Sequence, residues 1–174
     1  SEDGNIYALN ATNGAIKYSI TTGGSVNSSV AVFGDRAFVG SRDKRVYAFY
    51  VNGTSLWTSE LLDDVIDSSP AVANGKVFVA TWNGSLYALH EANGTINWRT
   101  NLAPAKEICS SPMVTYDKVF VGSTDNKVYA LSATNGAVLW NFTTGNKIYS
   151  SPSIHRGVVF IGSMDNNLYA LDMS

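Results

Sequence analysis

The 174-residue sequence has little of several residue types on which whole classes of protein depend. Its one cysteine, Cys109, excludes an internal disulfide framework and a cysteine-based zinc cluster. Charged residues make up only 15% and the formal net charge is −2, so we expect no nucleic-acid partner. No apolar run reaches the roughly 18 residues that a membrane-spanning helix needs, so we expect no insertion into a membrane.

Side chains suited to catalysis are also scarce. His90 and His155 are the only histidines, and no Gly-x-Ser-x-Gly nucleophile turn occurs. No group of Asp and Glu has the spacing of a calcium-binding loop. We therefore predict no catalytic, cofactor-binding or metal-binding residue in this chain.

What the sequence does contain is a repeat. A Tyr-Ala pair recurs at spacings of 40, 40, 42 and 40 residues, beginning at Tyr7, Tyr47, Tyr87, Tyr129 and Tyr169. A run such as Val-Phe-Val precedes most of these pairs. An Asn-Gly pair, an aromatic residue four positions later and a Ser-Ser pair follow in the same order. Self-similarity at a fixed period of this length indicates a repeat architecture.

Each repeat reads as four short strands, because runs of Val, Phe, Tyr and Trp alternate with Gly, Asn and Asp turn signals. A period near 40 with four strands per unit is typical of a β-propeller blade. We therefore predict an all-β fold of four-stranded antiparallel blades, forming a single domain over residues 1–174. The approximate repeat units are 1–27, 28–67, 68–109, 110–149 and 150–174.

The strand count leaves the closure of the propeller open. Seventeen strands are expected, one more than four blades require. The chain could form a four-bladed ring in which its first and last strands share a blade. Two chains could instead build an eight-bladed ring as a homodimer, or the chain could be an excised half of a longer propeller.

The most specific pattern is Ala-x5-Gly-x3-Trp, which runs from Ala88 to Trp98 and from Ala130 to Trp140. It resembles the tryptophan-docking repeat of the PQQ-like (quinoprotein-type) β-propeller family, and the resemblance covers essentially the whole chain. The second unit is one residue shorter, and the first ends on tyrosine. In that family the aromatic residue packs against the next blade. This implies a structural docking role for Tyr18, Trp57, Trp98 and Trp140 and for Gly14, Gly53, Gly94 and Gly136.

The same resemblance raises an enzyme hypothesis. Many quinoprotein dehydrogenases place a disulfide between adjacent cysteines above the quinone and bind calcium beside it. Here Cys109 is followed by Ser110, so that disulfide is impossible. We predict a protein that is not an enzyme and has no cofactor. Half of a quinone- or metal-dependent dehydrogenase-like propeller is the alternative, as is an isolated or engineered repeat fragment without activity.

Two recurring polar features are interpreted as structural. Asp3, Asp43, Asp125 and Asp165 recur in one turn of each unit, where aspartate stabilises tight turns by binding the backbone. The Ser-Ser pairs supply small side chains to the crowded strand expected nearest the propeller axis.

Positions at which the repeats differ are the better candidates for function. The residue before each Ser-Ser pair is Asn27, Asp67, Cys109 or Tyr149, and Trp82 occupies a turn expected at the same end of the strands. Loops on a rigid scaffold are where binding residues concentrate. We predict that these five residues form a binding face.

The family resemblance and the composition together favour a location outside the cytoplasm. The chain has few charges, one cysteine and many Ser, Thr and Asn residues. We predict an extracytoplasmic scaffold that binds a protein, peptide or other ligand. Pairing of an extended peptide with an edge strand is one plausible mode of binding.

Overall fold

The computed structural model describes residues 1–174, and every regular element in it is a β-strand. It contains no helix able to span a membrane. The strands are β1 (Asn5–Leu9), β2 (Ile16–Thr21), β3 (Ala31–Phe33), β4 (Arg36–Gly40), β5 (Val46–Tyr50), β6 (Ser55–Thr58), β7 (Ala71–Ala73), β8 (Lys76–Ala80), β9 (Ser85–His90), β10 (Ile96–Asn101), β11 (Met113–Thr115), β12 (Lys118–Gly122), β13 (Lys127–Ser132), β14 (Val138–Thr143), β15 (Ser153–His155), β16 (Val158–Gly162) and β17 (Leu168–Asp172).

These strands form five antiparallel sheets in chain order. Three are four-stranded, β3–β6, β7–β10 and β11–β14, each with its strands side by side in sequence order. The first sheet holds only β1 and β2, and the last holds β15, β16 and β17. The predicted all-β fold of four-stranded antiparallel blades is confirmed.

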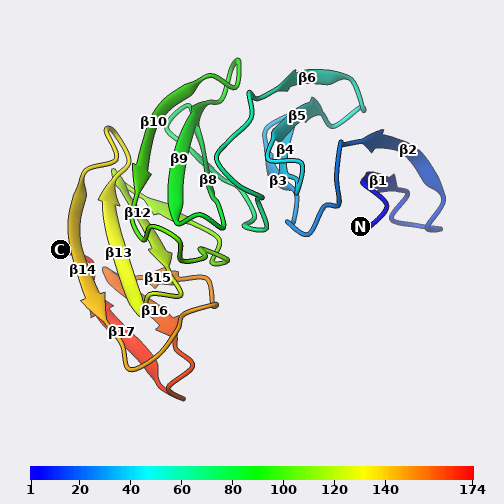
Figure 1. Ribbon diagram of the computed structural model, residues 1–174. Coiled ribbons are helices and arrows are strands. Elements are labelled where there is room, and N and C mark those ends of the chain that lie inside the picture. The colour runs from blue at the N-terminus through cyan, green and yellow to red at the C-terminus, as the bar shows by residue number, and fades with distance from the viewer.

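The sheets follow one another along an open arc (Figure 1). The β1–β2 sheet lies at one end of the arc and the β15–β17 sheet at the other, and the two do not pair. Of the arrangements that the strand count left open, a ring closed within one chain is therefore not the one observed.

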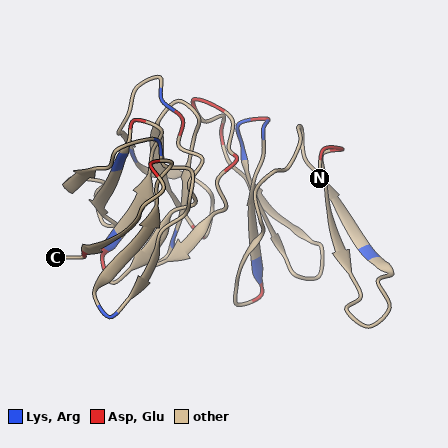
Figure 2. Ribbon diagram, turned by 90° about the horizontal axis from the view of Figure 1, so that it is seen from below, with Lys and Arg blue, Asp and Glu red and all other residues tan.

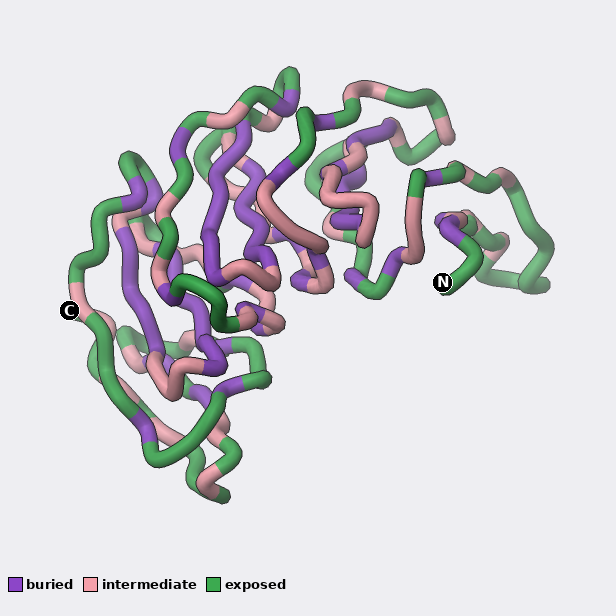
Figure 3. The backbone as a smooth tube through the Cα atoms, in the orientation of Figure 1, coloured by how far each residue is buried: buried purple, intermediate pink, exposed green.

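The core lies between successive sheets, and Figure 3 shows the buried backbone concentrated in the inner strands of the middle sheets. A repeated row of side chains builds it. Phe120 on β12 pairs with Ala130 on β13, which pairs with Trp140 on β14. The small alanine lets the two aromatic rings approach to 5.8 Å between centroids. Phe38 with Trp57 and Phe78 with Trp98 repeat this spacing.

Two tryptophans of these rows, Trp57 and Trp98, also lie against a glycine turn of the next sheet. A Cβ added to Gly94 would lie 2.4 Å from the Trp57 ring, and one added to Gly136 would lie 2.5 Å from Trp98. Both glycines have a positive φ, which side chains disfavour. A Cβ added to Gly14, at the start of the arc, would have no atom within 4 Å.

The Ser-Ser pairs connect strands and sheets. The first serine fastens the segment entering a sheet to a neighbouring strand. For example, Ser68 Oγ donates to the Ala80 carbonyl (3.0 Å) and accepts from its N–H (2.8 Å). The second serine bridges two sheets, since Ser69 N–H donates to Ser111 Oγ (2.9 Å). Hydroxyl side chains at these positions therefore bind the blades to one another.

Candidate functional site

The predicted binding residues lie on loops at one end of the sheets. This end carries the turns between β4 and β5, β8 and β9, β12 and β13, and β16 and β17, together with the segments that link one sheet to the next. We call it the binding face, after the prediction that it carries. Figure 2 shows many acidic and basic residues gathered on loops along one rim of the arc.

Three of the five predicted residues meet around Arg42. Its Nε and Nη2 donate to the two carboxylate oxygens of Asp67 at 2.8 and 2.6 Å. Its guanidinium carbon lies 4.8 Å from the centre of the Trp82 ring. With its amide oxygen turned toward Arg42, Asn27 accepts from Nε at 3.0 Å. A paired guanidinium stacked on an indole is held in one orientation.

Sequence reasoning did not select Arg42 as a binding residue. The signal was its position, because Arg42 occupies in the β4–β5 turn the place that Trp82 occupies in the β8–β9 turn. The two side chains stack because the turns of neighbouring sheets lie side by side. We call Asn27, Arg42, Asp67 and Trp82 the Arg42 cluster.

Cys109 lies half-buried at the equivalent position of the next sheet. Burial raises the pKa of its thiol to about 11, and the negative charges of Glu107 and Asp67 add to this effect. The thiol is therefore protonated near neutral pH, and a protonated thiol is a poor nucleophile. No group of three or more His, Cys, Asp or Glu residues in the chain is arranged to hold a metal ion.

Tyr149 stands apart from the Arg42 cluster. It is 44% exposed at the entrance to the last sheet, directly after the buried Ile148. It shares no hydrogen bond or aromatic contact with the cluster. The structure thus presents it as a separate exposed ring on the same face.

A second polar cluster, which sequence reasoning missed, surrounds Asp63. Its carboxylate accepts bonds from Thr81 Oγ1 (2.8 Å), Ser85 Oγ (2.7 Å) and Arg99 Nη2 (2.6 Å). Burial raises the pKa of Asp63, but the two hydroxyl bonds and the Arg99 charge outweigh it, so the pKa is lowered overall.

The equivalent turns of other sheets show what Asp63 replaces in the β8–β9 turn. Asp125 Oδ1 accepts the N–H of Lys127 (3.1 Å), and its Oδ2 accepts the Tyr129 hydroxyl (2.5 Å). The corresponding bonds at Asp3 and Asp165 confirm that these aspartates stabilise the turns. The β8–β9 turn has Asn83 instead, and Asp63 supplies the carboxylate from the segment that links β6 to β7.

The repeated sheets, the contacts between aromatic residues and glycines, and the arc define a protein of the β-propeller class. The particular family follows from comparison of the sequence. A family model described as "Outer membrane protein assembly factor BamB" matches residues 1–58 and 42–174, and the chain belongs to this family. The resemblance to PQQ-like propellers is thereby confirmed.

Relatives and solved structures agree with this assignment. The outer membrane protein assembly factor BamB of Moranella endobia (strain PCIT) is 35% identical over 77 residues, which are 44% of this chain and 20% of that protein. The match thus spans about a fifth of that relative's length.

The crystal structure of BamB from Moraxella catarrhalis superposes with a TM-score of 0.86 at 19% identity, covering 99% of this chain and 57% of that one. The quinohemoprotein alcohol dehydrogenase of Comamonas testosteroni gives 0.71 at 19% identity, covering 80% and 29%. At these identities both likenesses show the fold alone.

Proposed function

We propose that this chain is a non-catalytic scaffold that binds a protein or an extended peptide through the binding face. The observation that carries the proposal is the Arg42 cluster. It places a paired arginine and a half-buried tryptophan on loops whose residues differ from repeat to repeat. The contacts that hold the sheets together recur from one repeat to the next.

The chemistry of the cluster suits protein recognition. Arginine and tryptophan are enriched among the residues that contribute most to protein–protein affinity. Arg42 is already oriented by Asp67 and by the Trp82 ring, so little side-chain freedom is lost when a partner binds. Tyr149 adds a second aromatic contact on the same face.

The family supports the proposed location and partner class. Relatives carry the name of outer membrane protein assembly factors, so we propose that this chain acts outside the cytoplasm and binds an envelope protein. A second copy of the chain, completing a larger ring, is a further proposed partner. Likeness to a quinohemoprotein dehydrogenase supports the fold only and favours no reaction.

Site-specific photo-crosslinking tests the proposal with two matched tyrosines. Tyr149 lies on the binding face, whereas Tyr116, 80% exposed, lies in the turn between β11 and β12 at the opposite end of the strands. Each is replaced in turn by p-benzoylphenylalanine, and the protein is exported to the periplasm of a Gram-negative host. We expect a crosslink to an envelope protein from position 149 and none from position 116.

Two results would contradict the binding face. One is the absence of any adduct at position 149, and the other is the same adduct at equal yield from both positions.

An oxidoreductase module would instead show a new visible absorbance band on addition of quinone and calcium, and we expect none.

A further inference from the structure

The sequence contains six Asn-x-Ser/Thr triplets with no proline at the central position. They begin at Asn10, Asn27, Asn52, Asn83, Asn93 and Asn141. Such a triplet is the acceptor for N-linked glycosylation in proteins that act outside the cytoplasm. Because the triplet alone is a weak signal, the surroundings of each asparagine decide which of the six is built to carry a sugar.

Two of the six asparagines belong to polar clusters at the binding face. Asn27 is part of the Arg42 cluster, where its amide oxygen accepts from Arg42 Nε at 3.0 Å. Asn83 Nδ2 donates to Asp63 Oδ2 at 3.4 Å, and Ser85 of the same triplet is buried. A sugar on either side chain would enter these clusters, so we expect both asparagines to stay unmodified.

Two further triplets do not form the tip of an exposed turn. Asn10 is partly buried, and its backbone N–H and carbonyl bind Ala15 and Gly14 at 2.8 Å each. Asn141 lies within β14, where it pairs with Tyr129 of β13. The backbone of both triplets is therefore engaged in regular contacts.

Asn52 and Asn93 remain, and they lie in the turns between β5 and β6 and between β9 and β10 of neighbouring sheets. Both side chains are exposed. Each Oδ1 accepts the N–H two residues further on, from Thr54 at 2.9 Å and from Thr95 at 3.1 Å. This bond leaves Nδ2, the atom to which a glycan is attached, without a partner in the protein.

Asn93 differs from Asn52 in two respects. The Thr95 hydroxyl also donates to Asn93 Oδ1, at 2.8 Å, so the two side chains of the triplet are oriented together. In addition, a polar groove of about 280 Å³ adjoins this turn. It lies against the end of β6, the edge strand of the preceding sheet. The residues that line it are Thr58, Glu60, Asn93, Gly94 and Thr95.

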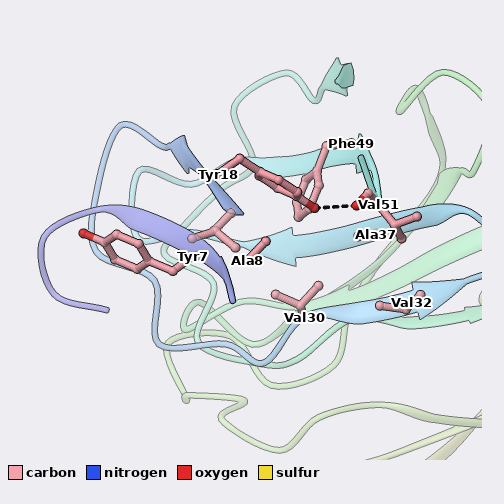
Figure 4. Close-up of a pocket in the computed structure, with 9 residues that line it drawn as sticks. Tyr7, Ala8, Tyr18, Val30, Val32, Ala37, Phe49 and Val51 are labelled. Atoms are coloured by element: carbon pink, nitrogen blue, oxygen red, sulfur yellow. Dashed lines mark hydrogen bonds between the residues drawn. The ribbon is translucent and has the colours of Figure 1, made fainter. Parts of the chain in front are cut away.

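The lining of this groove suits a sugar and differs from that of the other cavity in the molecule. The other cavity lies between the β1–β2 and β3–β6 sheets and has only apolar and aromatic side chains, among them Tyr18 and Phe49 (Figure 4). No apolar side chain lines the polar groove. The side chains of Thr58 and Glu60 are exposed and form no hydrogen bond or ion pair within the chain. Their oxygens are therefore free to bind the hydroxyl groups of a sugar.

The two sides of the polar groove are held at a fixed spacing. Trp57 on β6 donates its indole N–H to the Glu91 carbonyl at 2.8 Å. A Cβ added to Gly94 would lie 2.4 Å from the Trp57 ring, so the turn packs directly on β6. A sugar attached to Asn93 thus meets side chains that are already in place, which lowers the entropy cost of ordering it.

We propose that Asn93 is N-glycosylated and that its first sugar lies in the polar groove. An oligosaccharyltransferase supplies the sugar from a lipid-linked oligosaccharide. Asn93 Nδ2 forms a bond to C1 of the sugar, the bond from C1 to the phosphate of the lipid breaks, and the lipid phosphate leaves with the electron pair. Nδ2 gives up one proton to a base of the transferase. The inference rests on the proposed location outside the cytoplasm, where such transferases act.

A glycan at this position leaves the binding face free. Asn93 lies beyond the end of β9, whereas Trp82 lies in the turn before its start, so the whole length of the strand separates them. The glycan instead covers the end of β6, which has no neighbouring strand on its outer side. Covering an open edge hinders pairing with other chains.

Glycopeptide mass spectrometry of the protein purified from its native source tests the site. We expect a glycan on Asn93 and none on Asn27 or Asn83. Thr95→Ala, expressed in the same cells, keeps the asparagine but removes the triplet, and we expect complete loss of the glycan. Asn135 is the control within the chain, because it lies in the equivalent turn of the next sheet but is followed by Gly136 and Ala137.

A second measurement tests the groove. The protein is secreted from yeast, and the rates at which peptide N-glycosidase releases the glycans of Asn93 and Asn52 from the folded protein are compared. We expect slower release from Asn93, and Glu60→Ala should raise the rate at Asn93 alone. Absence of a glycan on Asn93 in this host, or equal release from the two turns in the parent, would overturn the proposal.

Failure of this inference is distinguishable from failure of the proposed function. Crosslinking from Tyr149 reports on the binding face, and fractionation of the native cells reports on the location. A protein that is found outside the cytoplasm and crosslinks there, but whose Asn93 is unmodified, would overturn the glycosylation site alone.

Discussion

Two tryptophans show how one residue type serves two roles in this chain. Trp98 sits in the repeated row, 9% exposed, with its indole N–H donating to the Ala133 carbonyl at 3.2 Å. Trp82 sits in a turn, and its ring is stacked under Arg42. Position within the repeat separates the two roles, because only Trp98 recurs at the same place in neighbouring units.

Replacement of Trp98 by alanine should destabilise the protein by about 3–5 kcal/mol, because it leaves a cavity between two sheets. For a chain of this size that corresponds to a fall in Tm of roughly 6–20 °C. Thermal unfolding followed by circular dichroism measures it. The control is Trp82→Ala, which removes a stacking contact of about 0.5–1 kcal/mol. Equal melting temperatures for the two variants would contradict these assignments.

Among the elements, the segment linking β6 to β7 carries its own anchoring carboxylate, Asp63. Asp63 anchors it to the β8–β9 turn through Thr81, Ser85 and Arg99. The segment also carries Asp67 of the Arg42 cluster, so this anchor helps to position the binding face.

The Asp63 anchor should make stability depend on pH. In the folded protein the pKa of Asp63 is lowered. The ionised carboxylate therefore adds its full contribution to the free energy of unfolding above the unfolded pKa of about 3.9, and this contribution is lost as pH falls through the folded pKa. Asp63→Asn should cost about 1–3 kcal/mol at pH 7, and the difference from the parent should narrow below about pH 4. Urea unfolding across this range measures it. A difference that is constant from pH 7 to pH 3 would rule out the charged anchor.

The elements themselves were predictable, and their loop contacts were not. Strands and turns follow from local signals that repeat, so seventeen strands in antiparallel blades could be expected before the structure. Arg42 meets Asp67 across 25 residues, and Arg99 meets Asp63 across 36. Each contact occurs once, so no periodic pattern encodes it. The open arc could not be predicted from the sequence either, because its curvature depends on the angles between packed sheets.

At the scale of the whole molecule, residues that recur between repeats hold the sheets together, whereas residues that differ between repeats lie on the rim. The rows of Phe, Ala and Trp and the serine bridges recur at three of the four junctions between sheets and hold the arc together. The rim carries the residues that vary. This division suits the proposed binding scaffold, since residues of the rim can change without loss of the fold.

The most direct test of that division compares binding and stability in one variant. The partner is the protein crosslinked from position 149, and its affinity is measured by calorimetry for the parent and for Trp82→Ala with Tyr149→Ala. We predict binding weaker by about tenfold or more, with Tm changed by only about 2–4 °C. Tyr116→Ala should alter neither quantity. Undiminished affinity in the double variant would contradict the account.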